Sequence, residues 1–231
     1  MNDFGYIKRN FEELSLELEK IAASVGASVP KLVSVTKSGS DDELIALVSA
    51  GARAIGENRP GELKRRGELL FANGLSPELH QIGTLQSNKA KLVHGASALI
   101  HSLDSESLAK ELNRLGSRDG IEIPVLVEIN SASEPQKSGI LPEMADEFIS
   151  SLEKYPMLKV RGLMTMGPVT DADEEIRKYF RLTKRLFDEL NKRYSFGEGA
   201  VLSMGMSDSY KVAIEEGSTL VRIGRRLFVK N

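Results

Sequence analysis

The chain has 231 residues, of which 41% are hydrophobic and 28% charged, and its 31 basic and 33 acidic side chains leave a formal net charge of −2. This composition is typical of a soluble globular protein, and the lack of a dense basic block argues against nucleic acid as the main partner. The absence of cysteine excludes disulfides and thiolate metal sites, and the three scattered histidines form no zinc motif, so we expect no metal site.

The first element expected is an amphipathic helix near the N-terminus. Apolar side chains from Phe4 to Ile21 recur at helical spacing and fall on one stripe. The segment lacks the apolar core of a signal peptide, and no later run reaches the roughly 18 apolar residues that a membrane span needs. We therefore expect a cytoplasmic protein without membrane contact.

Strand-like and helix-like patterns alternate along the rest of the chain. Short apolar segments predict strands at 32–35, 52–56, 79–83, 98–102, 124–130, 159–164, 200–203 and 220–224. Helical patterns lie between them, at 41–50, 60–70, 88–94, 106–115, 142–153, 173–194 and 209–216. Ser40 and Ser105 are the expected N-caps of two of these helices.

This alternation predicts an α/β fold with parallel strands whose two faces are covered by helices. Eight such units that close on themselves form a (β/α)8 TIM barrel, here with an extra N-terminal helix, and 231 residues lie within the usual span of that fold. An open, doubly wound sheet is the alternative. Because no linker or repeat interrupts the pattern, we expect a single domain over residues 1–231.

The functional site of a TIM barrel lies at the carboxyl ends of its strands. The first expected strand runs into Lys37, within the stretch KLVSVTKSGS. A solvated lysine is the ordinary interpretation of such a residue. A lysine partly desolvated in the barrel mouth would instead be a nucleophilic amine, able to form a Schiff base with a carbonyl compound.

Glycine-containing loops follow the last two expected strands. Ser203 and Gly205 come after the seventh strand and Gly224 after the eighth, where backbone N–H groups can be exposed. Phosphate sites in these barrels commonly use these two loops, although tight turns alone also require glycine. Beside a reactive lysine, the two loops suggest pyridoxal 5′-phosphate (PLP) as the cofactor.

Several longer motifs run through nearly the whole chain. They are LVSVTK around Lys37, IGENRPGEL, HQIGTLQSNK, LIHSLDS, EINSASEPQKSG, RGLMTMGP and LSMGMSDSYKVAIEEGSTLVRIG. In combination these motifs resemble the YggS/PROSC family, the pyridoxal phosphate homeostasis proteins. The resemblance implies a barrel similar to the N-terminal domain of alanine racemase, with PLP held as an aldimine on Lys37.

The resemblance also implies roles for other residues. Ser203 and the backbone at Gly224 and Arg225 would hold the phosphate, while Arg222 would face the pyridine nitrogen. An arginine stays charged, so it would keep that nitrogen unprotonated and weaken the ring as an electron sink. The residues expected to line the ring pocket are Asn58, His80 and Met164.

The remaining question is whether such a protein carries the cofactor or uses it. Racemase-type enzymes need a second acid or base, supplied by an additional β-rich domain of a partner subunit, and the chain ends shortly after Gly224. We expect no catalytic residue. The prediction is a monomeric PLP-binding protein of intracellular PLP homeostasis, which buffers the cofactor or delivers it to cofactor-free PLP enzymes.

Two alternatives stay open at this point. One is a single-domain, PLP-dependent, racemase-like enzyme, and the other is a Schiff-base aldolase acting on a sugar phosphate without PLP. The roles of Tyr210, Lys89 and Lys137 cannot be assigned from the sequence. Glu57 is expected to pair with a neighbouring lysine or arginine rather than to accept a proton.

Overall fold

The strands form a closed parallel barrel in a computed structural model that describes residues 4–168, 170 and 172–230. They follow one another around the barrel in chain order, and β8 pairs with β1 to close it. The strands are β1 (Lys31–Val35), β2 (Ala54–Glu57), β3 (Glu78–Gln81), β4 (Leu99–Leu103), β5 (Ile123–Glu128), β6 (Leu158–Met164), β7 (Val201–Ser203) and β8 (Leu220–Ile223). The expected (β/α)8 TIM barrel is confirmed, and the open sheet is excluded.

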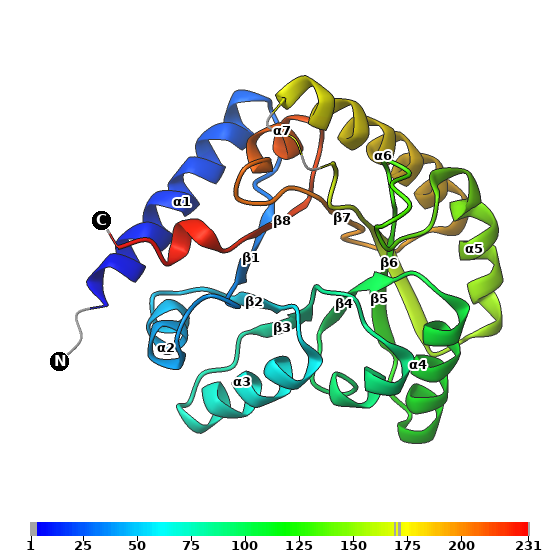
Figure 1. Cartoon of the computed structure of the whole chain (residues 1–231), viewed down its shortest axis with the longest axis horizontal. Coiled ribbons are helices and arrows are strands. Elements are labelled where there is room, and N and C mark those ends of the chain that lie inside the picture. Colours follow the sequence, from blue (N-terminus) through cyan, green and yellow to red (C-terminus); the bar gives the residue numbers. More distant parts are fainter. Residues whose placement is uncertain (1–3, 169, 171, 231) are drawn as a thin grey trace.

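Helices surround the barrel (Figure 1). The α-helices are α1 (Gly5–Ser24), α2 (Asp41–Ser49), α3 (Pro60–Ala72), α4 (Glu106–Asp119), α5 (Ala145–Ser151), α6 (Asp173–Tyr194) and α7 (Tyr210–Glu215). Short 3₁₀ helices are η1 (Ser87–Leu92), η2 (Pro142–Met144), η3 (Leu152–Lys154) and η4 (Arg225–Leu227). Among the described residues, no helix combines the length and apolarity that a membrane span needs, and no group of His, Asp and Glu could hold a metal ion.

The N-terminal helix α1 lies outside the ring and packs against α2, α7 and η4 (Figure 1). Its apolar stripe buries Ile7, Leu14 and Leu18, which belong to one cluster with Ile214 and Ile223. The amphipathic pattern therefore attaches this helix to the seam where the barrel closes.

The structure corrects three local expectations. The helix expected at 142–153 is divided into η2, α5 and η3, and the one expected at 88–94 is the 3₁₀ helix η1. Ser105 precedes α4 in extended backbone but makes no capping hydrogen bond. Ser40 does cap α2, in a reciprocal capping box with Glu43. Short stretches of 3₁₀ helix are frequent at the ends of α-helices and as connectors, and η1, η2 and η3 occupy such positions.

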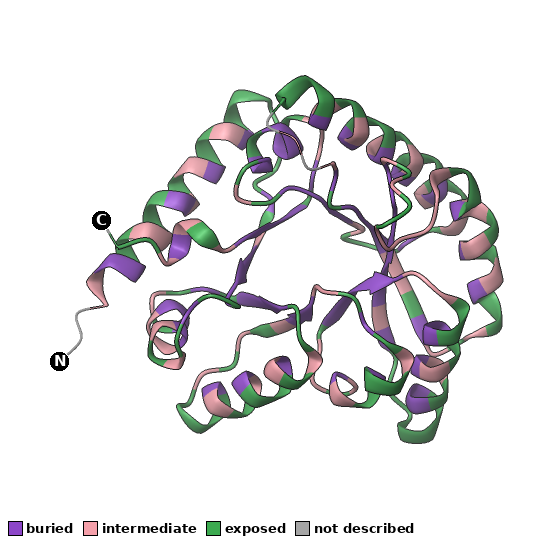
Figure 2. Ribbon diagram, viewed as in Figure 1, coloured by how far each residue is buried: buried purple, intermediate pink, exposed green. Residues whose placement is uncertain are grey.

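Two apolar layers hold the barrel together. Figure 2 shows that the strands are buried and that the helices are buried on the side facing them. Inside the barrel, Val33, Leu126, Met164 and Leu220 form an apolar cluster. Side chains two residues further along each strand lie on the same face and nearer the mouth. The residues two positions beyond this cluster line a cavity at the barrel mouth, and they are Val35, Glu128, Met166 and Arg222.

Candidate functional site

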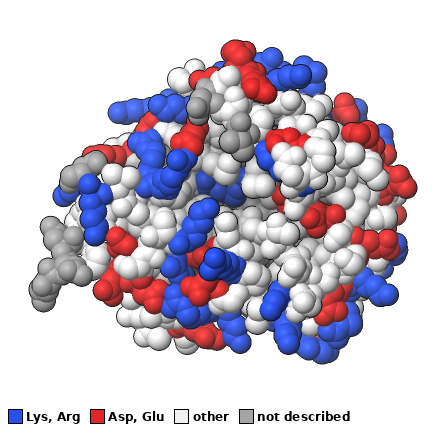
Figure 3. All heavy atoms as spheres, in the orientation of Figure 1, with Lys and Arg blue, Asp and Glu red and all other residues white. Residues whose placement is uncertain are grey.

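A cavity of about 420 Å³ opens at the carboxyl ends of the strands. Its size lies within the range of small-molecule sites, about 300–1,000 Å³. Lys and Arg side chains gather near the centre of this face, over β1, β2 and β8 (Figure 3). The lining residues are Val35, Lys37, Asn58, Ile82, Gly83, Thr84, Glu128, Met166, Met206, Ser207, Asp208, Arg222, Gly224 and Arg225.

Lys37 lies in the turn that follows β1. Val33 and Val35 are buried in β1, and Lys37 is exposed two residues beyond Val35. Lys37 is one of the residues that line the cavity beyond the carboxyl end of β1. Its amine is available for chemistry with a bound molecule.

Arg222 provides a fixed cation at the bottom of the cavity. It is 4% exposed, and its guanidinium donates to the carbonyl oxygen of Ser203 at 3.0 Å, to Ser203 Oγ at 2.5 Å and to the carbonyl oxygen of Thr165 at 3.0 Å. Burial lowers the pKa of Arg222 to about 10, an effect opposed by the nearby carboxyl of Glu128. This pKa still lies well above neutrality, so the guanidinium stays protonated.

Glu128 ends β5 and lines the same cavity, although the sequence patterns did not single it out as a site residue. It is 3% exposed. Burial, reinforced by the charge of Asp104 and opposed by that of Arg222, raises its pKa to about 7. The cavity therefore contains one carboxyl group that can gain or lose a proton near neutral pH.

Three more of the expected residues line the cavity: Asn58, Gly224 and Arg225. Arg225 is exposed, and its guanidinium pairs with the carboxylate of Asp208. A side chain at Gly224 would collide with the carbonyl oxygen of Val35, 2.7 Å from its Cβ position. Gly224 is therefore needed where β8 passes close to β1.

The other expected residues lie away from the cavity. Met164 is in the apolar interior cluster, and Met166 lines the cavity in its place. Gly205 has a φ of +96°, and the Cβ of Ala213 lies 2.5 Å from the position that a Cβ of Gly205 would take, so this glycine serves packing. The residues expected at the site that do not line this cavity are His80, Met164, Ser203 and Gly205.

Ser203 and His80 belong to a buried polar chain inside the barrel. Ser203 Oγ lies 3.1 Å from His101 Nδ1, and His101 Nε2 lies 2.9 Å from His80 Nδ1. At the far end, His80 Nε2 lies 3.2 Å from Glu78 Oε2. Burial lowers the pKa of both histidines, so they are neutral at physiological pH. The hydroxyl of Ser203 is fully buried and engaged by Arg222, which leaves Ser207 as the serine that reaches the cavity.

Comparison with known proteins agrees with this arrangement. Residues 10–231 match the family of the alanine racemase N-terminal domain. The pyridoxal phosphate homeostasis protein of Aquifex aeolicus is 39% identical over 222 residues, which cover 94% of this chain and 96% of that protein. The chain belongs to the pyridoxal phosphate homeostasis protein family. Its relative of the same name in Escherichia coli is 33% identical over 236 residues, covering 99% of this chain and 97% of the relative.

This member of the pyridoxal phosphate homeostasis protein family is also similar to several solved barrel structures. PipY of Synechococcus elongatus, with PLP bound, is 27% identical with a TM-score of 0.78, covering 92% of this chain and 100% of PipY. An unknown protein from Bifidobacterium adolescentis is 29% identical with a TM-score of 0.90, covering 99% and 97%. Alanine racemase of Corynebacterium glutamicum, 21% identical with a TM-score of 0.73, shares the fold, and this chain covers 62% of it.

Proposed function

We propose that this chain binds PLP in the mouth cavity, attaches it to Lys37 and keeps it available to other proteins. The observation that carries the proposal is the pairing of an exposed lysine amine with the buried, hydrogen-bonded guanidinium of Arg222 in one cavity. The aldehyde carbon of PLP bonds a lysine nitrogen, and its oxygen leaves as water. The names of the relatives and the PLP-bound structure of PipY support the choice of this cofactor.

The residues of the cavity fit such a group. Val35, Ile82, Met166 and Met206 offer apolar walls for an aromatic ring. On the β7–β8 side, the hydroxyl of Ser207 and the cation of Arg225 suit a phosphate, together with the backbone at Gly224. Arg222 would face the ring nitrogen, and Asn58 would line the ring pocket. In this proposal His80, Met164, Ser203 and Gly205 act indirectly, through the structure beneath the cavity.

Storage and delivery fit this site better than turnover. Arg222 has a pKa of about 10 and cannot act as an acid at neutral pH, so it would keep the ring nitrogen unprotonated. The hydroxyl of Tyr210 donates to Glu17 at 2.6 Å, and burial raises its pKa, so this tyrosine is not a ready proton donor. We propose a monomeric cytoplasmic carrier whose recipients are cofactor-free PLP enzymes.

Glu128 favours one alternative function. A carboxyl group with a pKa of about 7 that lines the cavity is suited to exchange a proton with a bound amino acid. A weak racemase-like activity would therefore depend on Glu128 as well as Lys37. Cα-proton exchange in D₂O, measured across a panel of amino acids for wild type and Glu128→Gln, tests this alternative.

The main experiment identifies the amine that carries the cofactor. Purified protein is mixed with PLP, reduced with borohydride, digested and examined by mass spectrometry. We expect the adduct on Lys37 and its loss in Lys37→Ala, while Lys64→Ala, on the exposed surface of α3, keeps it. Because the side chain of Lys37 is exposed, the free energy of unfolding should change by no more than about 0.5 kcal/mol.

Two further outcomes are informative. Wild-type protein that forms no adduct, or forms it at another lysine, would overturn the proposed attachment. Delivery is measured by adding the loaded protein to a cofactor-free PLP enzyme and following recovery of that enzyme's activity. A recovery no faster than with the same amount of free PLP would argue against a delivery role.

A further inference from the structure

The turn that carries Lys37 is held at both of its ends. The N–H of Gly39 donates to the carbonyl oxygen of Thr36 at 3.0 Å, which makes Lys37 and Ser38 the two central residues of a β-turn. Both central residues are exposed, whereas Thr36 and Gly39 are buried. The reactive side chain thus extends from a turn whose flanks are fixed inside the protein.

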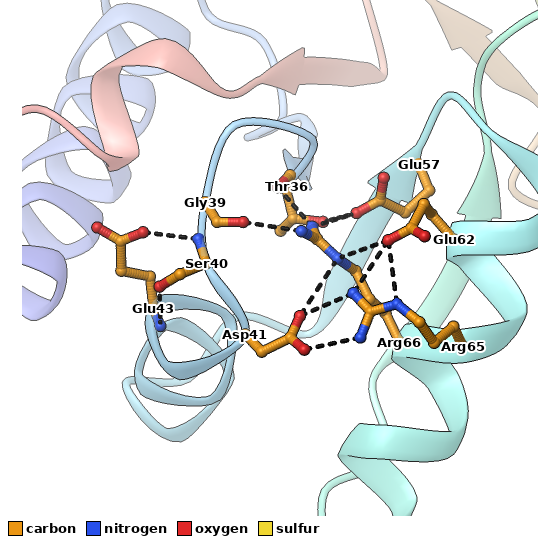
Figure 4. Close-up of polar contacts among 9 residues, drawn as sticks. All are labelled: Thr36, Gly39, Ser40, Asp41, Glu43, Glu57, Glu62, Arg65 and Arg66. Atoms are coloured by element: carbon orange, nitrogen blue, oxygen red, sulfur yellow. Dashed lines mark hydrogen bonds and ion pairs between the residues drawn. The ribbon is translucent and has the colours of Figure 1, made fainter.

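Arg66 of α3 contacts both flanks of this turn (Figure 4). Its Nη1 donates to the carbonyl oxygen of Thr36 at 2.5 Å, and its Nη2 donates to the carbonyl oxygen of Gly39 at 2.7 Å. The side chain of Arg66 is only 8% exposed. A guanidinium is a planar fork of donors, so a single side chain can bridge two carbonyl groups at a fixed separation.

Glu57 compensates the buried charge of Arg66. Its Oε1 lies 2.6 Å from Arg66 Nη1 and also accepts a hydrogen bond from the hydroxyl of Thr36. Glu57 is 3% exposed, and this pairing confirms the expectation that it serves a neighbouring cation. Asp41 and Glu62 lie close to Arg66 Nε, at 3.8 Å and 3.7 Å. A buried charge needs such partners to be tolerated in a folded protein.

The neighbouring side chains of α3 do not share this role. Arg65 pairs with the same two carboxylates, Asp41 at 2.7 Å and Glu62 at 2.9 Å, but lies on the exposed surface. Figure 4 shows Arg66 reaching to the turn, and Arg65 lying farther from it. The two adjacent arginines therefore share two carboxylates, but only Arg66 is buried, pairs with Glu57 and contacts the carbonyl groups beside Lys37.

We propose that Arg66, supported by Glu57, is the positioning residue for Lys37. By holding the carbonyl groups of Thr36 and Gly39, it directs the lysine amine towards the cavity before any cofactor arrives. A turn ordered in advance loses less conformational entropy when the cofactor is attached, so attachment is faster and tighter. This inference rests on the proposed function, because it concerns the same lysine.

The experiment compares Arg66→Lys with the matched control Arg65→Lys. A lysine at 66 keeps the charge beside Glu57, but its compact ammonium cannot reproduce the fork that bridges both carbonyl groups. We expect covalent loading of PLP at Lys37 to slow by about tenfold or more in Arg66→Lys. Arg65→Lys should load within about twofold of wild type.

A second readout needs no cofactor. In the cofactor-free protein, amide hydrogen exchange at residues 36–40 should accelerate in Arg66→Lys and stay unchanged in Arg65→Lys. The rate at which a succinimidyl ester acylates Lys37 should change in Arg66→Lys alone. Glu57→Gln removes the negative charge beside Arg66 but keeps its hydrogen bonds, since an amide oxygen still accepts from Thr36 and Arg66. This variant therefore tests whether loading depends on the charge of Glu57 or on the position of Arg66. We expect Glu57→Gln to load within about threefold of wild type.

The outcomes separate this inference from the proposed function. If wild-type protein forms no adduct at Lys37, the proposed function fails first. If wild type loads and Arg66→Lys matches Arg65→Lys in both readouts, Arg66 is not the positioning residue. If Glu57→Gln loads as slowly as Arg66→Lys, the two hydrogen bonds from the guanidinium to the turn are not what sets the rate, and the proposal is overturned. Should a single variant not fold, Arg66→Met combined with Glu57→Met removes both buried charges and should load as slowly as expected for Arg66→Lys.

Discussion

The two sides of the cavity each present a basic side chain, Lys37 near β1 and Arg222 on β8, but they differ in which part of the residue is fixed. On the β1–β2 side, Arg66 and Glu57 fix the backbone around Lys37, and the lysine side chain itself is left exposed. On the β7–β8 side, three acceptors fix the guanidinium of Arg222, which is almost fully buried. Lys37, which we propose as the attachment site, keeps freedom at the tip of its side chain, whereas Arg222 presents a fixed charge.

The two buried arginines also differ in how their charge is balanced. Arg66 contacts the carboxylate of Glu57 directly, at 2.6 Å. Arg222 is hydrogen-bonded to neutral oxygens, and the carboxyl of Glu128 acts on it through space. The second arrangement leaves both charges poorly solvated, which explains why the pKa of Arg222 falls to about 10 and that of Glu128 rises to about 7.

The largest predicted change in stability follows from removing the guanidinium of Arg222. Arg222→Met leaves the carbonyl groups of Ser203 and Thr165 and the hydroxyl of Ser203 without their buried donor. We expect the free energy of unfolding of the cofactor-free protein to fall by about 3–5 kcal/mol, measured by urea denaturation. The exposed Arg181 on α6 is the control, and Arg181→Met should cost about 1 kcal/mol or less. Equal losses in the two variants would contradict the interpretation that the buried hydrogen bonds of Arg222 fix its side chain and stabilise the fold.

The raised pKa of Glu128 predicts that the stability of the protein depends on pH. The unfolded chain releases this proton near pH 4.5, whereas the folded protein keeps it until about pH 7. Stability from this group is therefore fully present below pH 4.5 and is lost as the pH rises through 7. The loss amounts to up to about 3 kcal/mol.

Glu128→Gln should remove this pH dependence, because an amide does not titrate. The measurement is the difference in unfolding free energy between wild type and variant at pH 4.5, 6 and 8, without cofactor. The unfolding free energy of Glu128→Gln relative to wild type should increase from each pH to the next higher one. Glu147→Gln, on the exposed surface of α5, should show no such trend. A constant difference for Glu128→Gln would mean that its carboxyl is not held protonated.

Most of the rigid frame could be predicted from the sequence. The expected range 173–194 matches α6 (Asp173–Tyr194), and each expected strand overlaps an observed one. Periodicity is a local property, so it can be read without knowing the fold. The strand ends indicated Lys37 and Gly224, and the family resemblance added Asn58, Arg222 and Arg225. All five line the cavity.

Depth within the barrel could not be predicted. Met164 and Met166 point to the same side of β6 and its extension, but only the second reaches the cavity. Strand alternation gives the face of a residue and not its height, which depends on how far neighbouring strands extend. Met164, which the family resemblance implied as a pocket residue, lies in the interior apolar cluster, and Glu128 lies in an apolar strand pattern that does not point to a buried carboxyl in the cavity.

Arg66 illustrates the same limit on a helix. Lys64, Arg65 and Arg66 form one basic run, and their charge does not reveal which of them points inward. One signal was present, because Arg66 lies on the buried stripe with Leu63 and Leu70. An arginine at helical spacing from two core leucines indicates a buried cation, whose partner must come from another part of the chain.

The smallest expected effect concerns the turn that carries Lys37, on the β1–β2 side of the cavity. A Cβ at Gly39 would lie 2.4 Å from a ring carbon of Phe228, so Gly39→Ala must displace either the ring or the turn. We expect a loss of about 1–3 kcal/mol in unfolding free energy, with slower loading at Lys37. Gly61→Ala on α3 is the control, since nothing lies within 4 Å of its added Cβ. Gly39→Ala combined with Phe228→Leu should recover much of the loss, because the smaller side chain gives the methyl group room. If Gly39→Ala is as stable as Gly61→Ala and loads normally, the turn tolerates displacement, and its fixed position does not matter for Lys37.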